Sequence, residues 1–402
     1  MPLIQGQPKF VKMVMVTDSN NNKYYEMVWD GKSPTFDVKY GRVESTAVTT
    51  SYPIDQWNKK YTEKINKGYK DVTAFVSTEV TTAEPTTSTL AQIAESKVNE
   101  FITLMKKYTD HLVSTTYSVK AISVTQAQVD TAQRCIDKLK KLPKKATQQV
   151  VNELLLELYT TIPRRMSNTK EHLLPSIKLE DILQDEQDNL DAMASQVAQN
   201  APKPTKKSKK DLKQGKTLLD VLGLTMTEGK VNRNIEYLVK QLTGRKIEAI
   251  FDVNKPAEDA IFDKWLAQQK NKKTSYLLHG TKCTSVIPIL EIGLKIRPQG
   301  NFQFSGKVYG DGNYFSEVCA KSLNYTGYDK DMVLLVYEVH TGNPFVYNGW
   351  YNGNSFSLNY KELSTRGFDS TYVKAGNGLA NSEIICYKEE QCRIKHIIWL
   401  KR

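Results

Sequence analysis

The chain has 402 residues and a net charge of +12 at pH 7, which favours a polyanionic partner such as nucleic acid. Its length predicts roughly two to four domains, and 40% hydrophobic with 25% charged residues argues against disorder throughout. Five scattered cysteines without a Cys-x-x-Cys pair argue against a disulfide framework or a zinc site, and the lack of a membrane-length apolar run or a secretory signal predicts a soluble, intracellular protein without a membrane partner.

Residues from about 10 to 75 predict a small antiparallel sheet. Aromatic, β-branched and polar residues alternate in residues 23–29 and 36–40, with turn signals between the runs. Residues 54–65 then repeat apolar side chains at helical spacing, which predicts a helix packed across the sheet. We expect this first domain to cover residues 1–80.

Residues 81–88 form a polar, proline-broken linker, and beyond it the apolar period becomes helical. Two of the predicted helices begin with a capping-box pair, Thr89 with Gln92 and Thr125 with Gln128. The four predicted helices lie near residues 89–108, 125–139, 150–159 and 179–198. They predict an all-α bundle domain over residues 88–200.

Residues 201–216 are rich in lysine and proline and carry little that could enter a core. The simplest interpretation is an exposed basic linker. A nuclear-localisation or nucleic-acid-binding patch is the second interpretation.

Residues 217–402 mix helices and strands, which makes the whole chain a multidomain α+β protein. An amphipathic helix is predicted near residues 258–269. Apolar runs predict strands at residues 276–278, 332–339, 383–387 and 394–400, and we expect the last three to be central strands of one sheet. The chemistry is predicted to lie in this third domain.

Four spaced motifs in this domain, residues 276–281, 310–315, 321–325 and 382–387, offer groups that match the nicotinamide end of NAD. Gly280 has no Cβ and leaves backbone amides open to a carboxamide. The Ser322 hydroxyl supplies a second donor. Tyr325 and Tyr314 offer aromatic faces for a flat cationic ring.

Breaking the nicotinamide–ribose bond builds positive charge on the ribose, as in glycoside hydrolysis. A carboxylate against a ribose hydroxyl stabilises that charge. Glu383 is the candidate because it begins an apolar strand, whereas Glu389 and Glu390 have the pattern of surface acids. The set of motifs therefore predicts an ADP-ribosyltransferase.

Residues 276–402 resemble the catalytic domain of the poly(ADP-ribose) polymerases, with the family's His-Tyr-Glu triad at His279, Tyr314 and Glu383. The resemblance implies that His279 holds the adenosine ribose, that Tyr325 stacks on nicotinamide and that Glu383 polarises the nicotinamide ribose. The full set of catalytic and NAD-binding residues that it implies is His279, Gly280, Thr281, Lys295, Tyr314, Phe315, Lys321, Ser322, Tyr325 and Glu383.

The resemblance extends toward the N-terminus. Residues 128–142 and 155–163 are similar to the family's helical regulatory domain, and residues 39–43 occupy the place of the motif that names its Trp-Gly-Arg domain. Tyr40 replaces the tryptophan. The resemblance implies DNA contacts at Tyr40, Gly41 and Arg42, and a helical domain that obstructs NAD access until DNA engages the first domain.

We therefore expect NAD+ as substrate, no metal, and stimulation by DNA breaks. Acceptors would be proteins, the chain itself included, and growing ADP-ribose chains. A nuclear location is expected if the host is eukaryotic. Lys307 and Val308 depart from the family near the acceptor side, so mono-ADP-ribosylation of protein or of a DNA end is the first alternative. A DNA-binding protein with an inactive NAD fold is the second.

Overall fold

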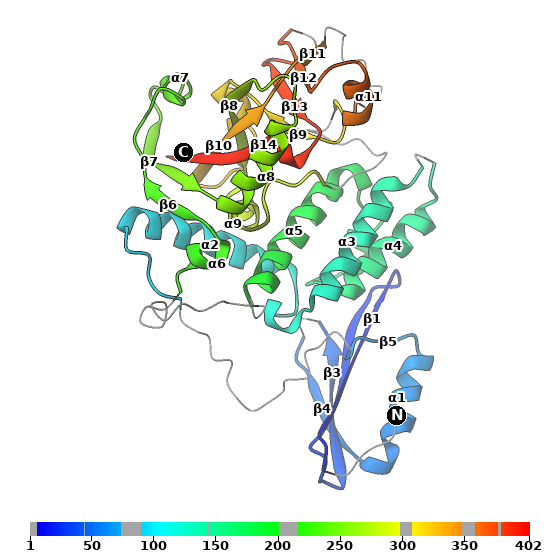
Figure 1. The fold of residues 1–402 in the computed structure, drawn as a ribbon. Coiled ribbons are helices and arrows are strands. Elements are labelled where there is room, and N and C mark those ends of the chain that lie inside the picture. The colour runs from blue at the N-terminus through cyan, green and yellow to red at the C-terminus, as the bar shows by residue number, and fades with distance from the viewer. Residues whose placement is uncertain are drawn as a thin grey trace. The chain divides into compact units, whose positions relative to one another are not determined.

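The computed structural model describes residues 6–43, 45–73, 90–143, 145–200, 216–297, 308–347, 358–376 and 379–402 (Figure 1). Two compact units emerge, and each is described by itself. Unit 1 holds Met1–Thr87 and His111–Ala201, and unit 2 holds Ser88–Asp110, Pro202–Gln299 and Gln303–Arg402. Residues 201–215 of the predicted basic linker, and Lys307, lie outside the described residues.

Unit 1 begins with the predicted antiparallel sheet, whose strand order is β4-β3-β2-β1-β5. Helix α1 (Trp57–Asn66) packs across it through Trp57, whose ring lies 5.0 Å from that of Phe36. The sheet-and-helix prediction is confirmed, because alternating apolar residues share the face that the helix covers. The strands are β1 (Lys9–Thr17), β2 (Asn21–Trp29), β3 (Thr35–Arg42), β4 (Val48–Pro53) and β5 (Lys70–Asp71).

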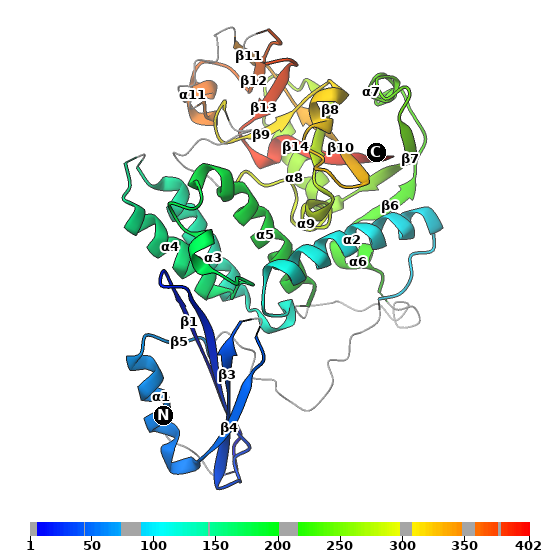
Figure 2. The same ribbon diagram turned by 180° about the vertical axis from the view of Figure 1, so that it is seen from behind.

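Three long helices complete unit 1, namely α3 (Gln126–Lys141), α4 (Gln148–Thr161) and α5 (Leu179–Asn200). Helix α3 packs against both α4 and α5, as Figure 2 shows from behind. The predicted capping box is present, since Thr125 accepts from the Gln128 amide and the Gln128 side chain accepts from Thr125. The buried Asn22 of β2 joins sheet to helices by donating to two carbonyls, those of Arg164 and Met166.

In the part of the chain that the structure describes, unit 2 contains two sheets. The first has the order β6-β7-β14-β10-β8 and the second β11-β12-β13-β9. The first sheet consists of β6 (Thr225–Glu228), β7 (Lys246–Asn254), β8 (Thr274–Thr281), β10 (Asp331–His340) and β14 (Cys392–Lys401). The second consists of β9 (Asn313–Phe315), β11 (Pro344–Tyr347), β12 (Ser370–Val373) and β13 (Glu383–Cys386).

The strand at residues 383–387 corrects one prediction. Strands β10 and β14 are central in the first sheet as expected, but β13 lies in the second sheet. It pairs there with β12 on one side and β9 on the other. A short apolar run indicates a buried strand but does not show which strands lie beside it. The sequence pattern therefore does not assign a strand to one sheet or the other.

Six shorter helices cover these sheets in the described ranges: α6 (Leu218–Leu222), α7 (Glu236–Lys240), α8 (Pro256–Ala267), α9 (Cys283–Ile292), α10 (Cys319–Leu323) and α11 (Tyr360–Thr365). Helix α8 corresponds to the amphipathic helix predicted near residues 258–269. Among the residues that the structure describes, no helix is long and apolar enough to cross a membrane.

Helix α2 (Ser96–Thr116) is shared between the units. It begins at Ser96, and Thr89, the predicted cap, lies outside the described residues. Its residues up to Asp110 fall in unit 2, because four apolar side chains, Val98, Phe101, Ile102 and Met105, are buried in the core of the unit 2 sheets. The sheet of β1 to β5 and the helices from His111 onward fall in one unit, and the predicted division into domains at 1–80 and 88–200 stays a prediction.

Candidate active site

The candidate site lies where the two sheets of unit 2 meet. Leu278 of β8 and Ser316, just after β9, exchange two backbone hydrogen bonds of 2.9 and 3.0 Å. This bridge brings the end of β8 beside β9, and α10 packs on β8 from the next stretch of chain. Motifs that are far apart in sequence therefore gather at one junction: His279 and Gly280, Tyr314, Lys321 and Ser322, and Glu383.

His279 is held in one tautomer. Its Nδ1 lies 3.0 Å from the carbonyl oxygen of Tyr314, which can only accept, so Nδ1 carries the hydrogen and Nε2 is left as an acceptor. Burial lowers the pKa of His279, and the bond to Tyr314 opposes this only in part. A neutral imidazole that offers an acceptor nitrogen suits a hydroxyl group as its ligand.

Gly280 has a packing role that the sequence does not reveal. A Cβ at this position would lie 1.7 Å from the carbonyl oxygen of Ser322, so any side chain would push α10 away from β8. The sequence pattern suggests only access for a ligand. Ser322 itself is buried, and its hydroxyl makes a long 3.4 Å hydrogen bond to the Leu278 carbonyl.

The two candidate stacking tyrosines differ in exposure. The hydroxyl of Tyr314 donates to the Gly310 carbonyl and accepts from the Tyr309 amide, both at 2.8 Å. These two hydrogen bonds tie the hydroxyl to the backbone of the segment that precedes β9. Burial raises the pKa of Tyr314 well above the ordinary value, so the hydroxyl stays protonated. Tyr325 is 43% exposed, and Lys321 Nζ lies 5.7 Å from its ring centroid. Tyr325 thus has the more open face.

Lys321 and Glu383 form the charged centre of the site. Lys321 Nζ lies 2.7 Å from a Glu383 carboxylate oxygen, and the side chains are only 15% and 7% exposed. Burial disfavours the ammonium, but the hydrogen bond and charge of Glu383 outweigh it and raise the pKa of Lys321. A buried carboxylate is stable here because the cation compensates it.

The other predicted NAD-binding residues are placed differently. Thr281 and Phe315 are buried, and the Phe315 ring packs 5.6 Å from that of Tyr337. Lys295 lies in the segment after α9 and forms a 2.7 Å ion pair with Glu389. Glu389 also accepts from the Ile296 amide, so it is more than the surface acid that its pattern predicted.

The predicted DNA-contacting residues lie on β3 of unit 1 and are engaged within that unit. The Tyr40 ring lies 5.9 Å from that of Tyr25, and Lys64 Nζ lies 5.9 Å from the Tyr40 ring. Arg42 donates to the Asn20 carbonyl at 2.6 Å. Gly41 sits between them on the same strand.

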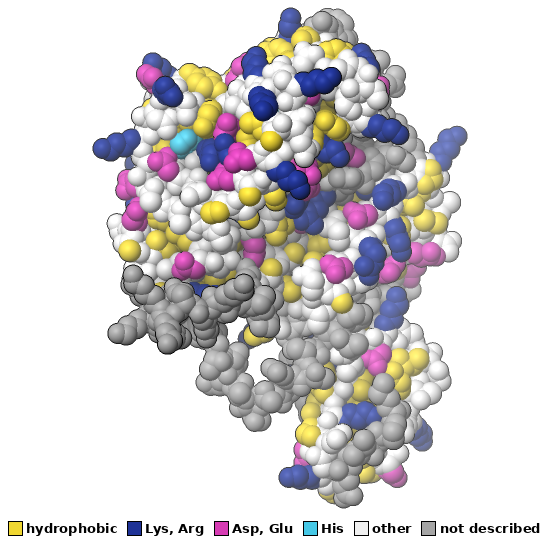
Figure 3. Space-filling model, in the orientation of Figure 1, with side chains coloured by type: hydrophobic (Ala, Val, Ile, Leu, Met, Phe, Trp, Pro, Cys, Tyr) yellow, Lys and Arg dark blue, Asp and Glu magenta, His cyan; other side chains and the backbone are white. Residues whose placement is uncertain are grey.

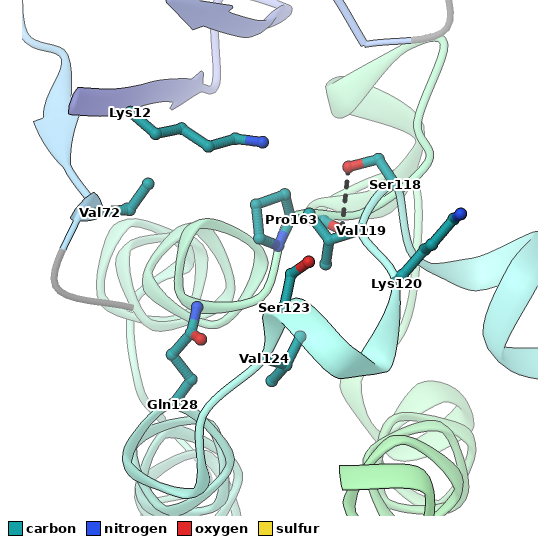
Figure 4. A pocket seen from close by; sticks show the side chains of 9 residues that line it. All are labelled: Lys12, Val72, Ser118, Val119, Lys120, Ser123, Val124, Gln128 and Pro163. Carbon is teal, nitrogen blue, oxygen red and sulfur yellow. Dashed lines mark hydrogen bonds between the residues drawn. The ribbon is translucent and has the colours of Figure 1, made fainter. Parts of the chain in front are cut away.

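A separate hollow of about 210 Å³ also lies in unit 1, between β1 and the segment before α3 (Figure 4). Lys12 reaches into it, but its ammonium is already paired with Glu26 at 2.9 Å. The residues that line it include none of the predicted site residues. On the face drawn in Figure 3, basic and acidic side chains are interspersed.

Within the described ranges, no cluster of three or more His, Cys, Asp or Glu side chains is placed to hold a metal ion. The donor set of the site is one imidazole, one carboxylate with its lysine, and tyrosine and serine hydroxyls.

Comparison with known proteins finds a family for the C-terminal part of the chain. Residues 229–402 match the family model of the poly(ADP-ribose) polymerase catalytic domain. The "Putative poly [ADP-ribose] polymerase-like 100L" of Invertebrate iridescent virus 6 is 55% identical over 170 residues, which cover 42% of this chain and 94% of the viral protein. The "Uncharacterized protein 101L" of the same virus is 41% identical over 191 residues, covering 48% of this chain and 79% of that protein.

A plant protein shows a more distant similarity. "Poly [ADP-ribose] polymerase 2" of Arabidopsis thaliana is 29% identical over 168 residues, which cover 35% of this chain and 26% of the plant protein. The viral relative named as polymerase-like is matched over nearly its whole length. The chain therefore belongs to the family of the poly(ADP-ribose) polymerase catalytic domain, which uses NAD+ as its substrate.

Proposed function

We propose that this protein cleaves the nicotinamide–ribose bond of NAD+ and transfers ADP-ribose to protein acceptors, itself included, and onto ADP-ribose chains. The observation that carries the proposal is the buried Lys321–Glu383 pair at 2.7 Å, at the same sheet junction as His279 and Tyr314. A buried ion pair of this kind is a weak contributor to stability, so a chemical role is the better reason for it.

In the proposed reaction the glycosidic bond breaks with both electrons leaving on the nicotinamide nitrogen, which neutralises the pyridinium. The ribose carbon becomes positively charged and is attacked by an acceptor oxygen, whose proton is lost. Glu383 accepts a hydrogen bond from a ribose hydroxyl and stabilises the developing charge. Lys321 fixes the position of the Glu383 carboxylate.

The remaining residues bind and orient the substrate. His279 presents an acceptor nitrogen to the adenosine ribose, and the open face of Tyr325 stacks on nicotinamide. The backbone at Gly280 and the Ser322 hydroxyl hold the carboxamide. Holding both ends of NAD+ places the scissile bond against Glu383, which makes the reaction effectively unimolecular up to acceptor attack.

Stimulation by DNA breaks is part of the proposal and rests on the N-terminal resemblance and on the net charge of +12. Helix α2 supplies a covalent route, because its residues to Asp110 belong to unit 2 and those from His111 to unit 1. We propose that DNA loosens the helices of unit 1 and thereby opens access to NAD+, which is a shift between two populations.

The alternative is mono-ADP-ribosylation, of protein or of a DNA end. Val308 departs from the family and packs, partly buried, against the core cluster around Tyr309. Lys307 lies outside the described residues. A changed acceptor side affects chain elongation more than NAD+ cleavage.

The test is incubation of the full chain with labelled NAD+, with and without a nicked or blunt duplex, followed by a denaturing gel. A DNA-dependent upward smear is expected. A single sharp band would replace polymer synthesis by mono-transfer, and equal label without DNA would remove the DNA switch. No label in either lane would favour a DNA-binding protein with an inactive NAD fold.

A truncation sharpens the regulatory part. A truncated chain that lacks the helices of unit 1 must keep residues 88–110, because Phe101 and its neighbours belong to the catalytic core. Such a truncation is expected to be active without DNA. A folded truncation whose basal activity does not rise would sink the autoinhibition proposal.

A further inference from the structure

The segment that follows α9 is held at three consecutive residues. The Leu294 carbonyl accepts from Asn313 Nδ2 at 3.2 Å. Lys295 Nζ contacts one carboxylate oxygen of Glu389 at 2.7 Å, and the Ile296 amide donates to the other at 2.9 Å. Glu389 therefore uses both oxygens on this segment and fixes where the Lys295 ammonium lies.

This segment is anchored beside the residue that holds His279. Asn313 is buried and directly precedes Tyr314, whose carbonyl receives the His279 Nδ1 hydrogen. Glu389 lies in the turn that follows β13, the strand that Glu383 begins. Through Asn313, the segment that carries Lys295 is therefore tied to the strand that anchors His279, the predicted ligand of the adenosine ribose.

The electrostatics of this corner favour a hydroxyl over a phosphate. His279 is neutral and offers a lone pair, so it accepts from a hydroxyl and has no hydrogen at Nε2 for an anion. The charge of Lys295 is already matched by Glu389, and each side chain is 36% exposed, so solvent reaches the pair. A phosphate on the ribose 2′ position would need donors and an uncompensated cation.

We propose that Glu389 is a specificity-determining residue that makes the site select NAD+ over NADP+ by keeping Lys295 in a neutral pair. The inference rests on the proposed function, since it takes NAD+ to bind with its adenosine at His279. Glu389 acts through Lys295 and the local charge, and it takes no part in bond breaking.

The test compares binding of ADP-ribose and ADP-ribose 2′-phosphate to the full chain by titration calorimetry, which needs no turnover. Glu389→Gln removes the charge but keeps an acceptor for the Ile296 amide, and Glu390→Gln, at an exposed neighbour, is the matched control. The wild type and the control should prefer ADP-ribose. Glu389→Gln should narrow that preference by about tenfold, mainly through tighter binding of the 2′-phosphate.

A double variant separates charge from shape. In Lys295→Met with Glu389→Gln the gain for the 2′-phosphate should disappear, because the Lys295 ammonium is gone. An unchanged preference in Glu389→Gln, or a gain that persists in the double variant, would overturn the inference. If Glu389→Gln does not fold, Glu389→Ser is measured instead with the same expectation.

The same variants distinguish this inference from the proposed function. In one outcome the wild-type protein binds ADP-ribose and consumes NAD+, but Glu389→Gln keeps the wild-type preference for ADP-ribose. This outcome would overturn only the role of Glu389. Wild-type protein that binds neither ligand would remove the proposed function, and the inference with it.

Discussion

The predicted residues of unit 2 and those of unit 1 use their polar atoms differently. In unit 2, Lys321 and Glu383 are partners of each other across distant parts of the chain, and His279 presents an acceptor nitrogen beyond the one atom that anchors its ring. In unit 1, the guanidinium of Arg42 holds a turn of its own sheet through the Asn20 carbonyl. His279 of unit 2 therefore keeps an acceptor that a substrate could use, whereas Arg42 of unit 1 directs one nitrogen to a local carbonyl.

Tyr40 makes the same point for aromatic residues. The Tyr40 ring lies 5.9 Å from the Tyr25 ring and 5.9 Å from the Lys64 ammonium. Tyr325 of unit 2 also has a cation near its ring, Lys321 Nζ at 5.7 Å, but Tyr325 is 43% exposed. A motif match identifies a position in the sequence. The contacts of the side chain at that position decide whether it can bind a ligand. The predictions that follow test this difference.

Replacing the carboxylate at the centre of unit 2 should have the largest effect. Glu383→Gln keeps an acceptor for Lys321 but removes the charge that stabilises the ribose cation, so activity on NAD+ should fall about 100- to 1,000-fold. Folding should persist, and NAD+ binding should change little. Steady-state release of nicotinamide and a thermal shift with NAD+ would measure these two properties.

The matched control is Glu317→Gln. Glu317 is an exposed carboxylate that accepts at 3.3 Å from the hydroxyl of Ser382, the residue that precedes Glu383. This control should keep activity within a few-fold of wild type. Equal losses in both variants, or wild-type activity in Glu383→Gln, would mean that the carboxylate has been assigned wrongly.

The next effect concerns the boundary between the units. Phe101 of α2 is fully buried, with its ring 4.9 Å from Phe251 and 5.6 Å from Trp399. Phe101→Ala should therefore destabilise the catalytic unit by about 3–5 kcal/mol. Denaturant unfolding followed in the presence of NAD+ would detect this, because the ligand reports on the unit that binds it.

Val113 provides the comparison on the same helix. It is also buried, but it lies beyond Asp110 and belongs to unit 1. Val113→Ala should leave the NAD+-stabilised transition in place and lower the stability of unit 1. If Phe101→Ala spares the catalytic transition and Val113→Ala lowers it, the division of α2 between the units is incorrect.

The elements of the fold were predictable wherever local periodicity decides them. The sheet with its covering helix in unit 1, the cap at Thr125 and the strand that ends in residues 279–281 follow from alternation, capping chemistry and apolar runs. The sheet membership of β13 and the division of α2 were not predictable, because both depend on which distant surface covers an apolar face. The spacing of apolar residues in a segment does not show which distant surface will cover them.

The candidate site divides in the same way. His279 and Glu383 stand out by their positions at strand ends. The packing role of Gly280 and the contacts of Glu389 depend on Ser322 and Lys295, which are distant in sequence, so no local pattern contains them. A carboxylate in a polar turn looks like a surface acid until its partner is known.

A smaller effect is expected in unit 1. Arg42→Met keeps the apolar stem and removes the 2.6 Å bond to the Asn20 carbonyl, so the free energy of unfolding of unit 1 should fall by roughly 1–2 kcal/mol without DNA. Lys39→Met, at an exposed position of the same strand, is the control and should be near neutral. If Arg42→Met weakens DNA binding but leaves thermal unfolding unchanged, the guanidinium is a free DNA ligand and the contrast between the units is lost.

The smallest expected effect is a shift, caused by His279, in the acidic limb of the pH profile of kcat/KM. Because burial lowers its pKa below the ordinary 6.5, the imidazole should stay neutral and accept from the ribose down to that pH, so kcat/KM for NAD+ should be level from about pH 8 to 6.5 and decline only below it. Below pH 6.5 the unfolded chain binds the proton more readily than the folded chain does, so stability should be lost as the pH falls through that range. His279→Gln retains an acceptor but cannot titrate, and its activity decline should move to more acidic pH. A decline that begins above pH 6.5, or one unmoved by the substitution, would show that another group controls the acidic limb and that His279, like Arg42 in this comparison, makes only local contacts.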